Sequence, residues 1–467
     1  MHCRDKERTL NRVNDGRRDF LKLSLAGISS LLGSGAASAL RAADTEGDYK
    51  AIVCILLEGG ADVFNMVAPI EQDPWQKYRE SRPDIALERG SLLALNHQNG
   101  DGSNPLKYGM RENMGRMREL FNDKKLAIVA NVGTLVRPVT KEEVENGVDI
   151  PFELFAHNTQ RAQWMYGDAT GNSHTGWAAR TADIFYPTPN PYFNVNVSDV
   201  GSLLQRGGRA EPIVFSEAYI SPDTMRYYGF GPESGGSGFG NLYQDLYEAA
   251  QKSTNRLLSA FAKKRVRELE RPDTLADLFD GVASFDGFGG GVHETGKPLG
   301  KQLELTAQIL SIHKNFPGDR KRQIFYVVHH GWDTHDSDNE QQAGYLSDSL
   351  GAFNDALEQM GLQNSVTTIT LSDFGRSLTS NGSGTDHGWG SYAFVTGGAV
   401  KGGEIYGRMP SLQKNSPDAW DGRVIPTISM EEYLATVVKW FGASQSELNE
   451  IFPNLKSFTK QDLGFMG

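Results

Sequence analysis

The stretch "QIFYVVHHGWDTHD", Gln323 to Asp336, joins an apolar run directly to a cluster of histidines and aspartates. Residues 324–328 are apolar without alternation, which predicts a strand buried on both faces of a parallel sheet. Residues 329–336 hold three of the ten histidines in the chain, together with two aspartates. Imidazole and carboxylate groups are frequent metal ligands and proton carriers. Because ligands collect beyond the carboxyl ends of parallel strands, this stretch predicts both a fold class and the place of a site.

Apolar runs of the same kind recur along the chain and alternate with helical patterns. They read "YKAIVCILL" at 49–57, "LAIVANV" at 126–132 and "VTTITL" at 366–371. Apolar residues spaced by three and four between 343 and 360 predict an amphipathic helix, and Ser429 with Glu432 predicts a capped helix start. Strands alternating with helices predict an α/β fold, a mostly parallel sheet sandwiched between helices.

The N-terminus has the pattern of an export signal. In "GRRDFLKLSLAGISSLLGSGAASA", the pair Arg17–Arg18 precedes a weakly apolar run, and Ala37–Ala39 forms a small-residue cleavage site. This order is typical of a twin-arginine signal peptide. The apolar run is broken by serine and glycine and falls short of the roughly 20 residues of a membrane-spanning helix. We therefore expect residues 1–43 to be signal and linker, the twin-arginine (Tat) translocase to be a partner during export, and the mature protein to be periplasmic or secreted without a stable membrane span.

Length and composition limit the class of protein to which the rest of the chain can belong. Residues 44–467 have the length of a single α/β domain, with insertions at about 185–240 and 270–298 where glycine and aromatic residues accumulate. The 47 basic and 58 acidic residues give a net charge of −11, which argues against a nucleic-acid partner. Cys54 is the only cysteine outside the signal, so no internal disulfide is expected and the apolar core must supply stability.

Acidic and imidazole groups follow several of the predicted strands. The residues expected to meet at one sheet edge as ligands of one or two divalent ions are Asp62, Asp333, His335, Asp373, Asp386 and His387. Zinc, magnesium, manganese and calcium are all compatible with these ligand types. Arg376 carries the planar fork that binds a phosphate or sulfate oxygen. Two alternatives remain: Asp62 caps the following helix, and Asp386 orients His387 instead of binding metal.

Longer motifs resemble the family named domain of unknown function 1501, a remote branch of the alkaline phosphatase and sulfatase superfamily. The resemblance extends from about Tyr49 to Leu455 and rests on "GGADVFN", "LFAHNTQRAQW", "HTGWAAR", "GWDTHD", "SDFGRSLTSNGSGTDHGWG", "GGAVKGGEIYG" and "MEEYLATVVKWFGASQSELNEIFPNL". It implies an alkaline phosphatase-like core and a metal site. By this resemblance Asp62 corresponds to the first metal-binding aspartate, whereas Phe374 stands where the superfamily commonly has a histidine.

The resemblance also points to a helix start where the superfamily carries its nucleophile. Ala156 stands at that place in "LFAHNTQ", which leaves His157 or Thr159 as catalytic candidates, or attack by a metal-activated water. The chain is therefore expected to be an exported metal-dependent hydrolase of phosphate or sulfate esters, acting on a small-molecule or polymer ester. The alternative is a catalytically degenerate binding or assembly protein on the same scaffold, which Ala156 and Phe374 favour.

Overall fold

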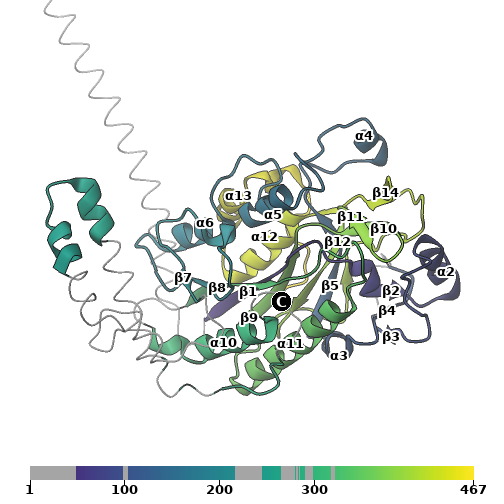
Figure 1. Ribbon diagram of the computed structural model, residues 1–467, viewed down its shortest axis with the longest axis horizontal. Helices are drawn as coiled ribbons and strands as arrows, with labels where there is room; N and C mark the ends of the chain where they lie inside the picture. Colours follow the sequence, from purple (N-terminus) through teal and green to yellow (C-terminus); the bar gives the residue numbers. More distant parts are fainter. Residues whose placement is uncertain are drawn as a thin grey trace, which may run out of the picture.

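A nine-stranded, mostly parallel sheet forms the centre of the computed structural model (Figure 1). The structure describes residues 49–97, 104–215, 245–263, 279, 282, 284–289, 298–316 and 321–467. The predicted signal peptide and much of both predicted insertions lie outside these ranges. Residues 185–215, at the start of the first predicted insertion, contribute two short strands to one end of the sheet.

The strands of the central sheet follow the order β13-β5-β12-β9-β1-β8-β6-β7, with β16 paired to β5. Only β12 runs antiparallel to its neighbours. The strands are β1 (Lys50–Leu57), β5 (Leu126–Gly133), β6 (Asn194–Asn196), β7 (Ile213–Val214), β8 (Arg322–His329), β9 (Val366–Ser372), β12 (Ser391–Thr396), β13 (Ile405–Tyr406) and β16 (Ile428–Ser429). In register, Leu57 of β1 lies opposite His329 and Ser372, so three parallel strands end level with one another. This shared edge positions the groups that follow them.

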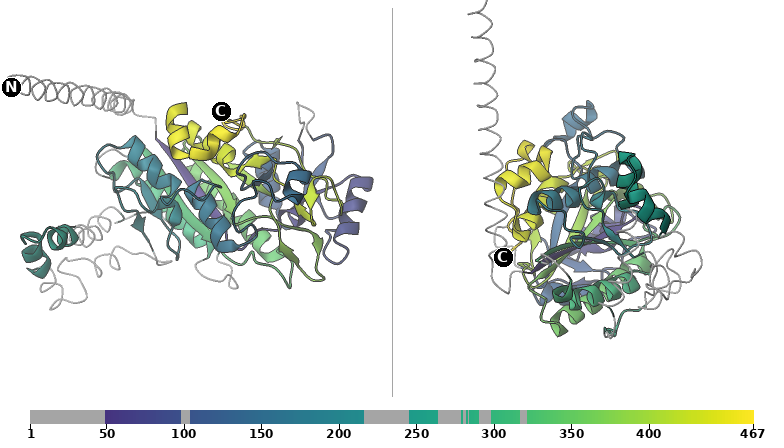
Figure 2. Two further views of the ribbon diagram at one scale, coloured as in Figure 1. Left: turned by 90° about the horizontal axis from the view of Figure 1, so that it is seen from above. Right: turned by 90° about the vertical axis from the view of Figure 1, so that its left-hand side faces the viewer.

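Helices cover both faces of the sheet, as the views in Figure 2 show. One layer contains α3 (Gly115–Asn122), α10 (Leu299–Ser311) and α11 (Glu340–Gln359), and the other contains α5 (His157–Tyr166), α6 (Trp177–Phe185), α12 (Met430–Phe441) and α13 (Gln445–Ile451). Alternate residues of β1 pack into opposite cores: Val53 and Ile55 on the first side, Ile52 and Cys54 on the second. Burying one such aliphatic side chain stabilises the fold by roughly 1.5–3 kcal/mol. The predicted fold class is confirmed.

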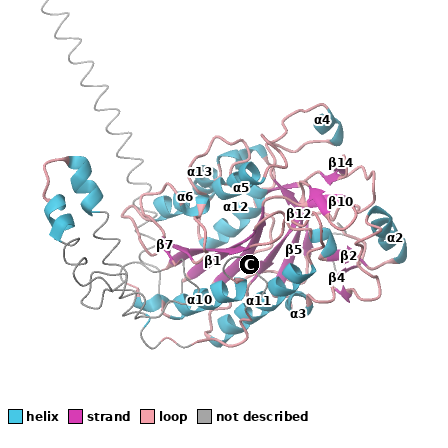
Figure 3. Cartoon of the chain, viewed as in Figure 1, coloured by secondary structure: helices cyan, strands magenta, loops and turns pink. Residues whose placement is uncertain are grey.

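Smaller elements lie around the sheet (Figure 3). They are α2 (Gln72–Ser81), α4 (Lys141–Glu145), β2 (Val67–Pro69), β3 (Leu93–Ala94), β4 (Tyr108–Met110), β10 (Arg376–Ser380), β11 (Thr385–His387), β14 (Ala419–Trp420), β15 (Arg423–Val424), and the 3₁₀ turns η1 (Val63–Asn65), η2 (Leu203–Gln205), η3 (His313–Asn315) and η4 (Pro453–Ser457). The short antiparallel pair β10–β11 begins four residues after β9. Its pairing places His387, the last residue of β11, opposite Arg376 at the start of β10. Within the described ranges, no helix is both long and apolar enough to cross a membrane.

The capped start of α12 confirms the predicted capping box and contains a buried acid. Ser429 accepts from the backbone N–H of Glu432, while the Glu432 carboxylate accepts from the backbone N–H of Ser429. The neighbouring Glu431 is fully buried; its Oε1 accepts from Ala169 N and Asn454 Nδ2, and its Oε2 has no hydrogen-bond partner among the described residues. Burial raises the pKa of Glu431 to about 7.

We expect this carboxyl group to make stability depend on pH. Because its pKa is higher in the folded than in the unfolded chain, its contribution is present below about pH 4.5 and is lost as pH rises through about 7. The loss is on the order of 3 kcal/mol at pH 8. Glu431→Gln should therefore be more stable than wild type at pH 8 and similar at pH 5, as measured by urea unfolding. An equal pH dependence in wild type and variant would contradict this assignment; Glu447→Gln, at the exposed capping box of α13, is the matched control.

Candidate metal centre

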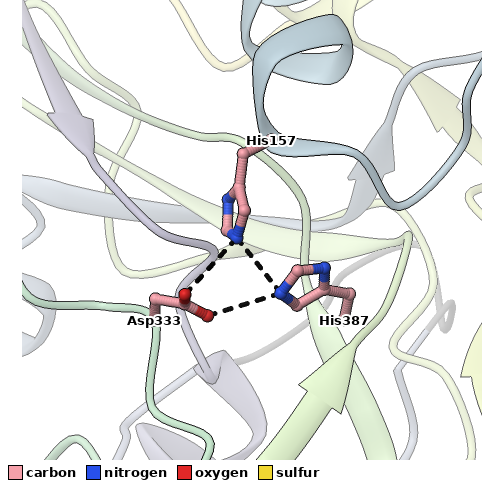
Figure 4. Close-up of side chains that lie close together, drawn as sticks. All are labelled: His157, Asp333 and His387. Carbon is pink, nitrogen blue, oxygen red and sulfur yellow. Dashed lines mark hydrogen bonds and ion pairs between the residues drawn. The ribbon is translucent and has the colours of Figure 1, made fainter.

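Three side chains converge at the carboxyl edge of the sheet (Figure 4). His157 is the first residue of α5, Asp333 follows β8 and His387 ends β11. One ligand atom from each lies within 4.8 Å of the other two. The Nε2 atoms of His157 and His387 are 3.1 Å apart, and the Asp333 carboxylate oxygens lie 3.6 Å and 3.4 Å from them. The fold thus gathers two imidazoles and a carboxylate that are far apart in the sequence.

A third imidazole, that of His335, lies at the same point. Its Nε2 is 3.0 Å from His387 Nε2 and 3.0 Å from Asp333 Oδ1. Its other ring nitrogen, Nδ1, lies 3.7 Å from the Asp386 carboxylate, which also accepts from Asn381 Nδ2. The predicted ligands Asp333, His335 and His387 are therefore brought together, with Asp386 beside His335.

Hydrogen bonds on the far side of two rings decide which nitrogen faces the centre. His387 Nδ1 donates to the carbonyl oxygen of Phe155 at 2.8 Å, and His157 Nδ1 donates to the carboxylate of Asp373 at 2.8 Å. Each neutral ring then carries its lone pair on Nε2. Burial lowers the pKa of His387 and favours its neutral form. Two lone pairs only 3.1 Å apart repel each other unless a cation lies between them.

The types of these ligand atoms and the distances between them suit a divalent cation. Two nitrogens held about 2.0–2.1 Å from one tetrahedral zinc ion are about 3.3 Å apart, close to the separations between His387 and its two neighbouring histidines. A single proton satisfies only one of these nitrogen pairs, whereas a divalent ion satisfies all of them together. Imidazole and carboxylate ligands suit zinc and other first-row divalent ions.

The Asp333 carboxylate is held in its charged form. Partial burial alone raises its pKa, but the Arg376 guanidinium, with Nη2 3.0 Å from Oδ1, and the neighbouring histidines lower it overall. Arg376 itself is fully buried, and its Nε and Nη1 have no hydrogen-bond partner among the described residues. Arg376 thus compensates the charge of Asp333. Its predicted role in binding a substrate oxygen remains a prediction.

Two other predicted ligands occupy different positions. The Asp62 carboxylate lies 2.7 Å from Arg82 Nη1 in a buried ion pair at the start of η1, and Arg82 Nε donates to the carbonyl oxygen of Leu378 in β10. The Asp373 carboxylate, which is fully buried, does not face the centre but holds the back of His157. A carboxylate behind a metal-binding histidine fixes its tautomer and ring orientation. Neither arrangement tests metal binding directly, so ligation by Asp62 or Asp373 remains a prediction.

The predicted nucleophile position lies at a helix start, as expected. Ala156 is the N-cap of α5, and His157, predicted to be catalytic, points into the group as a candidate ligand instead. The hydroxyl group of Thr159 donates to the carboxylate of Glu153. Thr159 therefore has a polar partner outside the three-residue group, and its role as a nucleophile is untested.

Two backbone conformations allow the segments to approach. Gly59, two residues after β1, has φ +117°, and a Cβ there would lie 2.4 Å from the backbone nitrogen of Asp333. Phe155 has φ +74°, which is strained for a residue with a side chain. That conformation aims its carbonyl at His387, whose own carbonyl accepts from Arg423 Nε at 2.9 Å. The position of His387 is thus fixed from both its ring and its backbone.

The sequence prediction assigned no site role to three residues that lie beside the centre: Glu58, Arg161 and His330. Arg161 lies one helical turn after His157, at the i,i+4 spacing that places two residues on the same helix face. Glu58 and His330 each follow a predicted strand directly. The i,i+4 spacing from His157 could therefore have indicated Arg161, and the position after a strand could have indicated Glu58 and His330.

Comparisons with known proteins support the family resemblance over part of the chain. Residues 318–425 match the family described as "Protein of unknown function (DUF1501)". No curated protein matches the chain. Among solved structures, the chain is similar to Ps i-CgsB in complex with k-i-k-neocarrahexaose, with a TM-score of 0.36, 11% identity, and coverage of 89% of this chain and 77% of that chain.

Two further solved structures are similar to the chain. The soluble domain of lipooligosaccharide phosphoethanolamine transferase A from Neisseria meningitidis has a TM-score of 0.35 and 8% identity, with 90% of this chain and 93% of that chain covered. The PsFucS1 sulfatase from Pseudoalteromonas sp. has a TM-score of 0.30 and 10% identity, with 93% and 76% covered.

Proposed function

We propose that the protein is an exported, metal-dependent hydrolase of phosphate or sulfate esters. His157, Asp333 and His387 would hold the divalent cation, with His335 as a further ligand. The observation that carries this proposal is the convergence of the Nε2 atoms of His157 and His387, 3.1 Å apart, with the charged carboxylate of Asp333. The Nδ1 atom of each ring is used in a hydrogen bond on the far side, which leaves Nε2 to face the centre. Export by the Tat translocase to the periplasm or the medium is proposed from the N-terminal signal pattern.

The chemistry of such a site depends on the bound cation, on the exposure of its ligands to solvent and on the residues that hold those ligands. A divalent ion, when bound, polarises an ester oxygen and lowers the pKa of water. Asp333 is about half exposed and His157 and His387 about one quarter, so a small ester or the end of a polymer can reach them from solvent. Asp373 orients His157, and Arg376 keeps Asp333 charged. The choice of phosphate or sulfate esters follows the family resemblance.

The proposal is tested with protein folded in its native host. Metal analysis should find about one divalent ion per chain, and a panel of aryl phosphates, phosphodiesters and aryl sulfates should reveal turnover. Asp333→Ala should lose both metal and turnover, whereas Asp336→Ala, which removes an exposed acid from the same segment, should keep both. Absence of metal and of turnover in the wild-type protein would overturn the proposal.

A second candidate function is metal-dependent binding or assembly without turnover. It is favoured by Ala156 at the helix start and by the Thr159 hydroxyl, which donates to Glu153. Among the described residues, no hydroxyl side chain is hydrogen-bonded to His157, Asp333 or His387. A wild-type protein that binds the metal tightly but turns over no ester of the panel would support this candidate.

A further inference from the structure

A row of charged side chains crosses the sheet edge beside the metal centre. Its members come from consecutive strands of the order β9-β1-β8-β6: Asp373 follows β9, Glu58 follows β1, His330 follows β8 and Asp199 follows β6. Arg161 of α5 joins the first two. We call Asp373, Arg161, Glu58, His330 and Asp199 the ion-pair row. Its charges alternate in sign.

Arg161 holds Asp373 by both carboxylate oxygens. Its Nε lies 3.0 Å from Oδ1 and its Nη2 lies 3.0 Å from Oδ2, the parallel two-bond geometry of strong arginine–carboxylate pairs. The backbone nitrogen of Gly59 adds a bond to Oδ2 at 3.1 Å, and His157 Nδ1 donates to the same oxygen. Because the Asp373 side chain has no exposed surface, these are the contacts that fix the plane of its carboxylate.

The outer part of the row holds Arg161 in turn. Its Nη1 donates to Glu58 Oε1 at 2.5 Å, and the other oxygen of Glu58 pairs with His330 Nδ1. His330 Nε2 contacts Asp199 at 2.9 Å. The hydrogen bond to Glu58 raises the pKa of His330 to about 9, which favours a charged imidazole at neutral pH. Within the row, each charge therefore lies next to at least one charge of opposite sign.

We propose that Arg161 is a positioning residue of the metal centre, acting through Asp373 on the imidazole of His157. Arg161 fixes the Asp373 carboxylate, the carboxylate fixes the Nδ1–H tautomer and the ring plane of His157, and His157 Nε2 is thereby aimed at His387 and Asp333. Without Arg161, the carboxylate keeps Gly59 and His157 as its hydrogen-bond partners among the described residues, and the ring loses its rigid support. This inference rests on the proposed function, in which His157, Asp333 and His387 bind a divalent cation.

Binding of Co²⁺ and Zn²⁺ to the full-length mature protein tests the inference by titration calorimetry and by the visible spectrum of bound Co²⁺. Arg161→Gln is expected to bind both ions about 10-fold more weakly, with an altered Co²⁺ spectrum. Loss of a group hydrogen-bonded to a ligand typically costs about 10- to 100-fold, and Arg161 acts one contact further out, through Asp373. Arg161→Lys keeps the positive charge but cannot form the two parallel hydrogen bonds, so its affinity for both ions should lie between those of the wild-type protein and Arg161→Gln.

A matched control separates positioning from general loss of an ion pair. Arg116 of α3 also joins two carboxylates, Glu119 and Asp355, but it lies with the helices on the opposite face of the sheet. Arg116→Gln should leave affinity and spectrum unchanged. If Arg161→Gln does not fold, as judged by circular dichroism, Glu58→Gln replaces it. Glu58→Gln should weaken binding measurably but by less than about tenfold, since it removes only the outer support of Arg161.

The outcomes separate the two proposals. If the wild-type protein binds neither ion, the metal centre and with it this inference are overturned. If the wild-type protein binds and folded Arg161→Gln binds within twofold of it with the same spectrum, the positioning role alone is overturned. Unchanged affinity in Glu58→Gln, where Arg161→Gln is unfolded, leads to the same conclusion.

Discussion

His387→Ala is expected to abolish tight binding of a divalent cation. His387 is the one imidazole in contact with both of the others, at 3.1 Å from His157 Nε2 and 3.0 Å from His335 Nε2. Its removal takes away a ligand itself, so the loss of affinity should exceed the 10- to 100-fold loss typical of a residue that only orients a ligand. The dissociation constant for Zn²⁺ or Co²⁺ measures the effect, and ester turnover should disappear with it.

The same substitution elsewhere provides the control. His174 is exposed, and His174→Ala should leave metal affinity unchanged. His157→Ala should behave like His387→Ala, because both rings turn a lone pair toward the centre. Wild-type affinity in a folded His387→Ala protein would show that the histidine cluster does not hold the ion.

Asp62→Ala is expected to destabilise the protein by about 3 kcal/mol while leaving metal affinity unchanged. The Asp62 carboxylate lies 2.7 Å from Arg82, and both side chains are almost fully buried. Breaking a buried ion pair from one side typically costs about 3–5 kcal/mol, because the remaining charge is left in the interior. Arg82 keeps hydrogen bonds to Asn65 and to two backbone carbonyls, which places the expected loss at the lower end.

Urea unfolding in the presence of a chelator measures this loss without any contribution from bound metal. Asp84→Ala, at an exposed position two residues after Arg82, should change stability by less than about 0.5 kcal/mol. A fall in metal affinity of tenfold or more in folded Asp62→Ala would instead support Asp62 as the ligand that sequence reasoning predicts.

Local sequence patterns were sufficient for much of the fold. The apolar runs at 49–57, 126–132 and 366–371 became β1, β5 and β9 with boundaries within a residue or so. Runs of this type are recognisable because a strand covered on both faces has no exposed positions to make polar. The capping box at Ser429 was equally readable, since it joins residues only three apart.

The sequence predicted only part of the candidate site. Position after a strand correctly indicated the edge at which Asp333, His335 and His387 meet. It did not show whether a carboxylate near a strand end faces the three-residue group, as that of Asp333 does, or is held by an arginine away from it, as those of Asp62 and Asp373 are. Strand ends specify where a residue lies, whereas its nearest oppositely charged neighbour decides which way its carboxylate points.

The sequence by itself determined the alternation of strands and helices and the edge where polar groups gather, because these depend on contacts between near neighbours and on the burial of apolar runs. Tertiary structure alone decided that His157 faces His387 across 230 residues, that Asp373 supports it from behind, and that Arg161 joins the ends of β9 and β1. Hydrogen bonds and ion pairs act over about 3 Å in space and leave no periodic trace in the chain. Their partners become known only when the sheet order places one strand end beside another.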